Sequence, residues 1–339
     1  ARAQSENNFI ICTLRAIYKT VATNMNKIVL KILFLLIFSI SNSQTNPTLE
    51  MAKSMSIEKI KIEDLTDFVA KNISDKKQKA EFYYYWISLN IEYDYETRDA
   101  LRDENLSDQE LVDIVNPFLV FDKKKAICSG YSNLYKLFMD LSEIECEIIS
   151  GYAKSKNKLT LKINLEDNTG HAWNSIKIDD SWLLVDTTWA KQFEEDISDY
   201  YFDTLPERLI LSHFPKDEKW QLIEKPISII EFNKKPYVNS LYFDTGFGDL
   251  PELTEDTEYY YIEFPKIASK NWLTKLTYDS ENKINESIFP EYEEKENSNL
   301  FKFKKNGIPK KAILNVVVTY FDWEKQTKSE YNNIIKYQL

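Results

Sequence analysis

The feature that most constrains the fold is a cysteine at the start of an amphipathic helix pattern. After Cys128, apolar and aromatic residues recur at helical spacing, which predicts a helix with one buried face (Tyr131, Leu134, Tyr135, Phe138 and Leu141). A thiol at a helix N-terminus lies beside backbone N–H groups without intrahelical partners, and these groups favour the thiolate. The preceding Lys123–Lys125 add positive charge. The alternative is a small buried residue at a helix start, the more frequent role of an arbitrary cysteine.

Two segments of high β-propensity follow, His171–Ile178 and Ser181–Thr188, and only Asp179-Asp180 separates them. Such a two-residue connection predicts a β-hairpin. In this register His171 and Asp186 are diagonal neighbours on one face of the sheet, within hydrogen-bonding reach. A three-residue loop would place them on opposite faces. The hairpin therefore predicts a pair in which Asp186 fixes the tautomer of His171 and His171 accepts a thiol proton.

The segments around Cys128, His171 and Asp186 resemble the transglutaminase-like (transglutaminase core) superfamily, most closely its kyphoscoliosis-peptidase-like branch. Further stretches resemble the same branch: Tyr85–Asp94, Gly151–Ala153, Leu211–Pro215 and Trp220–Leu222. Together they cover residues 57–225. The resemblance implies an α+β, papain-like cysteine domain, in which the helix that carries the cysteine packs on an antiparallel sheet that carries the histidine and the aspartate.

The resemblance also implies a catalytic triad of Cys128, His171 and Asp186 that acts on peptide or glutamine carboxamide bonds through an acyl-enzyme. The backbone N–H of Cys128 is one expected oxyanion donor. Ser129 occupies the position at which many transglutaminases have Trp, so the second donor is not identified and hydrolysis by a cysteine peptidase is favoured over cross-linking. The alternative function is a catalytically silent binding or scaffold module with the same fold.

Aromatic residues near the triad segments are candidates for substrate binding, and we assign Trp86, Trp173 and Trp189 to this role. For Trp86, core packing is the more frequent alternative. His213 precedes a Phe-Pro pair in a predicted turn, and we expect it to be structural. Because the chain has 2 histidines and one cysteine expected to be accessible, we predict no metal site and no cofactor.

The net charge of −11 disfavours nucleic acid and anionic membranes as main partners, so we expect a protein or peptide substrate. With 6 glycines in the chain, no Gly-rich phosphate-binding loop is recognisable.

The segment Met25–Ser43 has the pattern of a secretory signal peptide: a basic start, the apolar run Ile32–Phe38, and the small-x-small site Ser41–Ser43. The apolar run is shorter than the roughly 20 residues that a transmembrane span needs. We therefore predict a secreted or periplasmic protein without stable membrane insertion after cleavage. Residues 1–24 are interpreted as an upstream extension of no assigned function.

Cleavage would remove Cys12 and leave Cys128 and Cys146. The second lies in an alternating pattern with Ile144 and Ile148, typical of a half-buried strand. We therefore predict that Cys146 is a small core residue and that no disulfide forms.

The predicted domains are a catalytic domain over residues 44–225 and an immunoglobulin-like β-sandwich over residues 226–339, with the boundary between Pro226 and Pro236. In the first we predict helices over 50–72, 76–91 and 108–115, and a strand over 159–165. In the second we predict strands over 237–243, 258–264, 272–279, 300–304, 312–321 and 331–338, with 316–320 central in its sheet. Glu291–Glu296 is expected to be an acidic surface loop.

Overall fold

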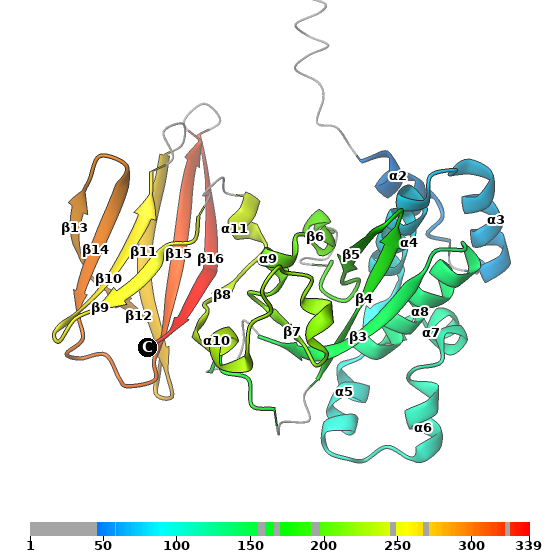
Figure 1. The fold of residues 1–339 in the computed structure, drawn as a ribbon, viewed down its shortest axis with the longest axis horizontal. Helices are drawn as coiled ribbons and strands as arrows, with labels where there is room; N and C mark the ends of the chain where they lie inside the picture. Colours follow the sequence, from blue (N-terminus) through cyan, green and yellow to red (C-terminus); the bar gives the residue numbers. More distant parts are fainter. Residues whose placement is uncertain are drawn as a thin grey trace, which may run out of the picture. The chain divides into compact units, whose positions relative to one another are not determined.

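The computed structural model describes residues 46–57, 59–154, 160–165, 170–191, 197–244, 249–266, 271–322 and 326–339 (Figure 1). The predicted extension over residues 1–24 and the predicted signal peptide over 25–43 lie outside these ranges. Residues 51–339 form one compact unit, which is described below. Within the described part of the chain, no helix is both long enough and apolar enough to cross a bilayer.

The first part of this unit is helical. The predicted helix over 76–91 is confirmed as α4 (Lys76–Asn90), whose first turn is capped by the Asp75 carboxylate, which accepts from the backbone N–H of Gln78. The predicted helix over 108–115 is confirmed as α6 (Asp108–Asp113). The predicted helix over 50–72 is wrong in extent, because two helices occupy this range. The remaining helices of this part are α2 (Pro47–Ser54), α3 (Ile62–Asn72), α5 (Tyr95–Arg102), α7 (Pro117–Lys123) and α8 (Cys128–Leu141).

An antiparallel sheet with the strand order β6-β5-β4-β3-β7 follows the helices. Its strands are β3 (Cys146–Ala153), β4 (His171–Ile178), β5 (Ser181–Val185), β6 (Phe202–Thr204) and β7 (His213–Pro215). The predicted hairpin register is confirmed, because Ile178 pairs with Ser181 across Asp179-Asp180. Asp179 turns the chain with a φ of 52°, a left-handed conformation that Asp tolerates better than most residues. The predicted strand over 159–165 is wrong: described residues 160–165 contain no strand.

Helix α8 packs on α4 and on the sheet, which explains why its apolar face is buried. Phe138 stacks on Tyr83 of α4 with ring centroids 4.4 Å apart, and both rings are buried. On the sheet side, the Asn174 amide of β4 donates to the Ser132 carbonyl at 3.1 Å. Each large apolar side chain buried here contributes roughly 1.5–3 kcal/mol. Leu141, predicted to be buried, is 52% exposed in the last turn of the helix.

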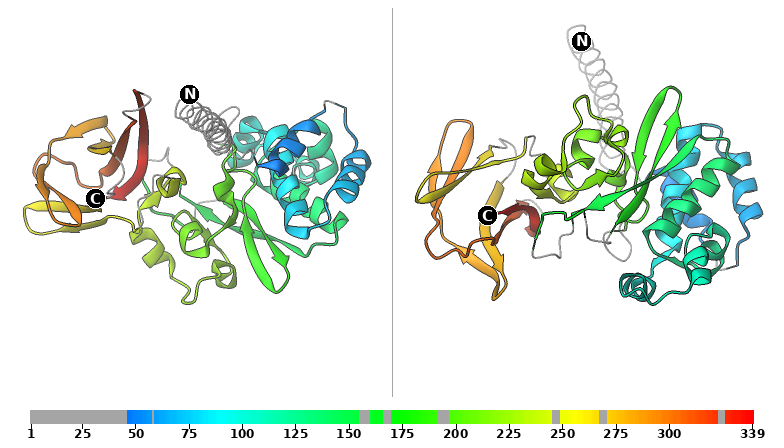
Figure 2. Two further views of the ribbon diagram at one scale, coloured as in Figure 1. Left: turned by 90° about the horizontal axis from the view of Figure 1, so that it is seen from above. Right: turned by 60° about the horizontal axis from the view of Figure 1, so that its bottom comes forward.

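The α+β fold class is thus confirmed, with the cysteine-bearing helix on an antiparallel sheet and further β-sheets in the C-terminal region. Figure 2 shows the helices in blue to blue-green together beside the green strands.

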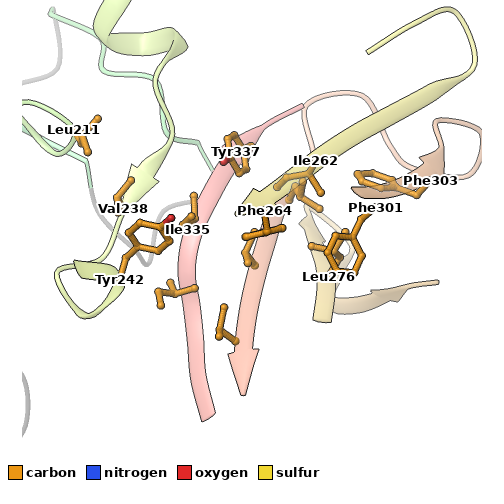
Figure 3. Packing of buried hydrophobic residues seen from close by; sticks show 14 residues of the cluster. Leu211, Val238, Tyr242, Ile262, Phe264, Leu276, Phe301, Phe303, Ile335 and Tyr337 are labelled. Carbon is orange, nitrogen blue, oxygen red and sulfur yellow. The ribbon is translucent and has the colours of Figure 1, made fainter. Parts of the chain in front are cut away.

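The C-terminal strands form two sheets, ordered β13-β14-β10-β9 and β12-β11-β15-β16-β8. They are β8 (Tyr237–Val238), β9 (Glu252–Glu255), β10 (Tyr259–Pro265), β11 (Asn271–Ser280), β12 (Lys283–Ile288), β13 (Glu291–Glu294), β14 (Ser298–Lys304), β15 (Ile313–Asp322) and β16 (Thr327–Gln338). A common apolar core includes Ile262 and Phe301 from the first sheet and Leu276, Val316 and Ile335 from the second (Figure 3). The predicted central position of 316–320 is confirmed, since β15 lies between β11 and β16.

Two sequence predictions in this region are wrong. The strand predicted over 237–243 is limited to β8, after which α11 (Leu241–Asp244) begins. The acidic loop predicted over Glu291–Glu296 is largely strand β13, all of whose residues are exposed. An edge strand that carries charges on both faces has no hydrophobic alternation, and therefore reads as a loop in sequence.

Contacts cross the predicted domain boundary. The ammonium group of Lys154, which directly follows β3, donates to the carbonyls of Phe232 and Lys235, at 2.8 and 2.6 Å. Leu161 packs with Tyr237 and Ile313. Two independent domains over 44–225 and 226–339 remain a prediction.

Candidate active site

The cysteine is the first residue of α8, and the local backbone explains how it is presented. Ile127, directly before it, is extended and makes no side-chain cap. The chain reaches this point through the short strand β2 (Lys125–Ala126), which pairs in parallel with β1 (Glu92–Tyr93). A Cβ at Gly130 would lie 2.8 Å from the Ala126 Cβ and 2.9 Å from the Ile114 carbonyl oxygen. The first turn of α8 therefore accommodates only glycine at this position.

The structure brings the three predicted triad residues together. Nε2 of His171 lies 2.7 Å from Oδ2 of Asp186. The side chain of His171 also hydrogen-bonds to the thiol of Cys128, which receives a second hydrogen bond from the backbone of Ala172. Because Nε2 is engaged by the carboxylate, Nδ1 is the nitrogen that remains for the thiol.

Asp186 is fully buried and accepts hydrogen bonds on both oxygens. Oδ1 accepts from the backbone N–H groups of Thr188 and Trp189, at 2.8 and 3.2 Å. Oδ2 is shared by two histidines, since Nε2 of His213 lies 3.0 Å from it. Burial raises the pKa of Asp186, but the two histidines lower it by more, so the carboxyl remains ionised well below its usual range.

The same contacts set the protonation of the other two residues. Burial lowers the pKa of His171, whereas the Asp186 carboxylate and the Cys128 thiol raise it to about 10. Burial raises the pKa of Cys128, but hydrogen bonds from His171 and the backbone of Ala172 bring it below its usual value, against a smaller opposing effect of Asp186. Both shifts favour the form of the pair in which Cys128 is a thiolate and His171 an imidazolium.

The expectation that the neighbouring lysines activate the thiol is wrong. The ammonium group of Lys124 lies 3.5 Å from the ring centroid of Phe121. Lys125 forms ion pairs with Asp94 at 3.3 Å and Glu96 at 3.4 Å. His171 supplies the positive charge instead.

Cys146 has the predicted structural character. It is 3% exposed at the start of β3, and neither Cys128 nor Cys146 forms a disulfide. Burial raises the pKa of its thiol to about 12, in spite of Lys136 and a hydrogen bond from Asn174, which lower it. Such a thiol is not a nucleophile at neutral pH.

Of the three tryptophans predicted to bind substrate, two are packing residues. Trp86 is 0% exposed, stacks on Phe121, and donates its indole N–H to the Met55 carbonyl. Trp173 is 1% exposed, so it too presents no surface to a substrate. Trp189 is partly exposed, with its ring centroid 5.5 Å from that of His171. It is the one member of the predicted set that can contact a substrate at the triad.

Two residues near the triad were not predicted to take part in it. His213 was predicted to be structural, but it contacts the triad carboxylate. Tyr93 interacts electrostatically with the thiol: burial and the charge of Cys128 raise its pKa to about 12, so its hydroxyl is neutral at neutral pH. Its place in the Tyr85–Asp94 motif was the available signal in the sequence.

His171, Asp186 and His213 each offer one ligand atom, and these three atoms lie within 4.8 Å of one another, close enough to bind one metal ion. Both histidines, however, lie at hydrogen-bonding distance from the same carboxylate oxygen, at 2.7 and 3.0 Å. His171 is moreover held protonated, and a protonated imidazole has no lone pair for a metal. The group therefore fits a hydrogen-bonded network better than a metal centre.

Residues 63–187, a range that contains all three triad residues, match the family model described as the transglutaminase-like superfamily. The chain is similar to the human kyphoscoliosis peptidase, with 25% identity over 206 residues, covering 58% of this chain and 30% of that protein. It is also similar to Hillarin of Drosophila melanogaster, with 28% identity over 153 residues, covering 38% of this chain and 19% of that protein. The predicted family resemblance is confirmed, and the match spans less than a third of the length of these curated relatives.

A solved structure described as "Crystal structure of a TGase" is also similar, with 16% identity, 52% of this chain and 42% of that chain covered, and a TM-score of 0.30.

Proposed function

Because residues 63–187 match the model of the transglutaminase-like superfamily, we propose that this protein is a cysteine enzyme that cleaves or exchanges carboxamide bonds. The observation that carries the proposal is the continuous hydrogen-bonded arrangement of Cys128, His171 and Asp186, with the thiol pKa lowered and the imidazole pKa raised. A perturbed pair of this kind is typical of a nucleophile and its base.

In the proposed mechanism the Cys128 thiolate attacks the carbonyl carbon, and the electron pair of the C=O bond moves to oxygen. His171 then donates its proton to the nitrogen of the leaving amine or ammonia, the C–N bond breaks, and a thioester remains. Neutral His171 next takes a proton from water, the resulting hydroxide attacks the thioester carbonyl, and the C–S bond breaks to release the carboxylic acid and the thiolate.

Asp186 keeps its charge throughout this cycle, because hydrogen bonds at both oxygens stabilise the carboxylate. It holds the His171 ring so that Nδ1 faces the thiol. The backbone N–H of Cys128 at the start of α8 is one donor to the developing oxyanion. The neutral hydroxyl of Tyr93 is our candidate for the second donor.

We favour hydrolysis over cross-linking, because Ser129 follows the nucleophile where many transglutaminases have Trp. A protein or peptide substrate is the matching partner class. We further propose that the protein is exported, on the signal-peptide pattern over Met25–Ser43. The second candidate function is a silent binding module of the same fold, and the burial of Trp86 and Trp173 favours it, because they leave fewer aromatic contacts for a substrate.

The two functions are separated by measuring how fast iodoacetamide modifies each cysteine, from acidic to alkaline pH, with the labelled site identified by peptide mass spectrometry. An enzyme should show Cys128 modified faster than a free thiol at neutral pH, and Cys146 should serve as the slow internal reference. Reaction of Cys128 no faster than a free thiol would support the binding module. Turnover of a glutamine-containing peptide, with and without a primary amine, then distinguishes hydrolysis from acyl transfer by the mass of the product.

A further inference from the structure

We propose that His213 is a positioning residue for the triad, which orients the Asp186 carboxylate and limits how strongly that carboxylate binds His171. This inference rests on the proposed function. The ring centroid of His213 lies 5.3 Å from that of His171, and the hydrogen bond of His213 to Asp186 is its polar link to the triad.

His213 is enclosed on every side that its contacts define. Its side chain is 0% exposed. The ring centroid of Trp189 lies 4.5 Å away and that of Trp173 5.1 Å away, both edge-on. A polar ring buried in this way needs partners for both nitrogens, because an unsatisfied buried polar group costs about 1–3 kcal/mol. Asp186 binds Nε2, and Oγ of Ser212 lies 2.8 Å from Nδ1.

These two partners select one tautomer. Burial lowers the pKa of His213, and although Asp186 opposes this effect, the pKa stays below its usual value, so the ring is neutral at neutral pH. A neutral ring has one N–H, and the carboxylate at 3.0 Å accepts a hydrogen bond but cannot donate one. The proton must therefore be on Nε2, which leaves Nδ1 as an acceptor. The Ser212 hydroxyl lies 2.8 Å from Nδ1 and 3.3 Å from the Leu209 carbonyl oxygen, and the shorter contact is the one to which it donates.

The hydrogen bond between His213 and Asp186 connects two strands that are not neighbours in the sheet. His213 lies on β7, the edge strand next to β3, whereas Asp186 directly follows β5. The backbone N–H of Asp186 is held by the Tyr201 carbonyl at 2.9 Å. The backbone of Asp186 is thus held by Tyr201, next to the edge strand β6, and its carboxylate is held by His213 on the other edge strand, β7.

The shared oxygen has an electrostatic consequence for His171. A neutral donor on Oδ2 withdraws part of the charge that would otherwise stabilise the His171 imidazolium. His213 therefore keeps His171 less basic than an unshared carboxylate would, and a less basic imidazolium gives up its proton more readily to the leaving group.

Within the triad His171 also faces the Cys128 thiol. The other titratable groups whose charges couple to Asp186 are four tyrosines: Tyr84 from α4, Tyr93 from β1, Tyr131 from α8 and Tyr201 before β6. Burial, before any other cause, raises the pKa of Tyr84 and Tyr201 well above the usual value. These hydroxyls stay neutral over the range in which the histidines titrate, so the titration of His171 reports on Asp186 and Cys128. Because the His213 variants leave Cys128 in place, a shift between wild type and variant reports on Asp186.

The test is ¹⁵N NMR of the histidine rings in the full chain, which has 2 histidines and therefore two simple sets of ring signals. Wild-type His213 should be neutral at neutral pH, protonated on Nε2 and unprotonated on Nδ1. His213→Met removes the donor but keeps the side-chain length, and should raise the titration midpoint of His171 by about half a pH unit. His213→Gln places an amide donor near the same position and should restore most of the wild-type midpoint.

Ser212→Ala is the milder variant for the case in which His213→Met does not fold. It should leave the proton on Nε2 but remove the hydrogen bond that the Ser212 hydroxyl donates to Nδ1, which makes Nε2–H a weaker donor to Asp186 and should raise the midpoint of His171 in the same direction by a smaller amount. A wild-type His213 protonated on Nδ1, or a His171 midpoint unchanged in the folded variants, would overturn the inference. These readouts do not depend on turnover, so they fail independently of the alkylation experiment that tests the proposed function.

Discussion

The carboxylate of Asp186 and the imidazole of His171 meet at 2.7 Å because a two-residue turn sets the register of β4 and β5. Diagonal neighbours on one sheet face have a fixed separation, so the backbone register alone sets the distance between positions 171 and 186. The amide N–H groups of Thr188 and Trp189 then lock the carboxylate from its other oxygen. The orientation of the base is thus a property of the hairpin.

We expect Asp186→Asn to fold and to lose activity. The amide can accept on one side only, so it would stabilise the wrong tautomer of His171 and would not hold the imidazolium. By analogy with the serine triad the rate should fall by up to about 10⁴. Rates of peptide turnover or of Cys128 alkylation at neutral pH measure the effect, and circular dichroism checks the fold. A fall of less than tenfold in a folded variant would contradict the assignment.

The pair also makes stability depend on pH, with a sign that follows from the shift of His171. Its folded-state pKa is raised from 6.5 to about 10, so its contribution is fully present below pH 6.5 and is lost as pH rises toward about 10. The pKa of Asp186 is lowered, so the contribution of Asp186 is present above its usual value of 3.8 and is lost in stronger acid.

Denaturant unfolding of wild type and Asp186→Asn tests this dependence. The stability advantage of the wild type should be largest between about pH 4 and 6.5 and should shrink as the solution becomes alkaline. An advantage that grows in alkali would mean that His171 is neutral in the folded protein.

Much of this site follows from local sequence. The helical pattern after Cys128 and the two-residue turn between β-rich segments are short-range signals. The first was sufficient to predict the helix, and the second was sufficient to predict the register of the hairpin. The contact between His213 and Asp186 was not predictable in this way, because the two residues are 27 positions apart and meet only after β7 has paired with β3. No hydrophobic period encodes such a contact.

The role of Trp86 shows a second limit. Every residue from Phe82 to Ser88 is buried, so α4 has no polar stripe that distinguishes a core-facing side from a cleft-facing side. A tryptophan on such a helix cannot be assigned to a pocket from its position. The exposed charges of β13 led to a different error, in which a strand was predicted to be a loop. A solvated edge strand lacks the hydrophobic alternation by which strands are recognised.

Gly151→Ala should damage both stability and the site. A Cβ there would lie 2.4 Å from the Phe214 carbonyl oxygen and 2.4 Å from Cη2 of Trp173, whose ring packs beside His171. Overpacking of this kind costs about 1–3 kcal/mol. Gly170→Ala is the matched control, because its Cβ would meet the Gly151 carbonyl oxygen at 3.4 Å. Equal unfolding midpoints for the two variants would contradict this account of the packing.

Export is tested at the N-terminus of the mature protein. If Met25–Ser43 is a cleaved signal peptide, the protein should be recovered outside the cytoplasm with its first residue near Gln44. Fusion of this segment to a reporter enzyme should export the reporter, and replacing apolar residues of Ile32–Phe38 with charged ones should retain it. Soluble cytoplasmic protein that still carries Met25 would contradict the proposal.

The two cysteines of the described chain provide the sharpest test of the nucleophile. Cys128→Ala should abolish amide cleavage and acyl transfer while changing the unfolding free energy little, because the side chain that is removed is small and partly exposed. Cys146→Ala should keep the activity per folded molecule and lower the unfolding free energy by roughly 1 kcal/mol, since it removes a buried sulfur from β3. Activity assays and denaturant titrations on both variants make the comparison. If Cys146→Ala abolished activity and Cys128→Ala did not, the nucleophile would be the wrong cysteine and the binding-module function would take precedence.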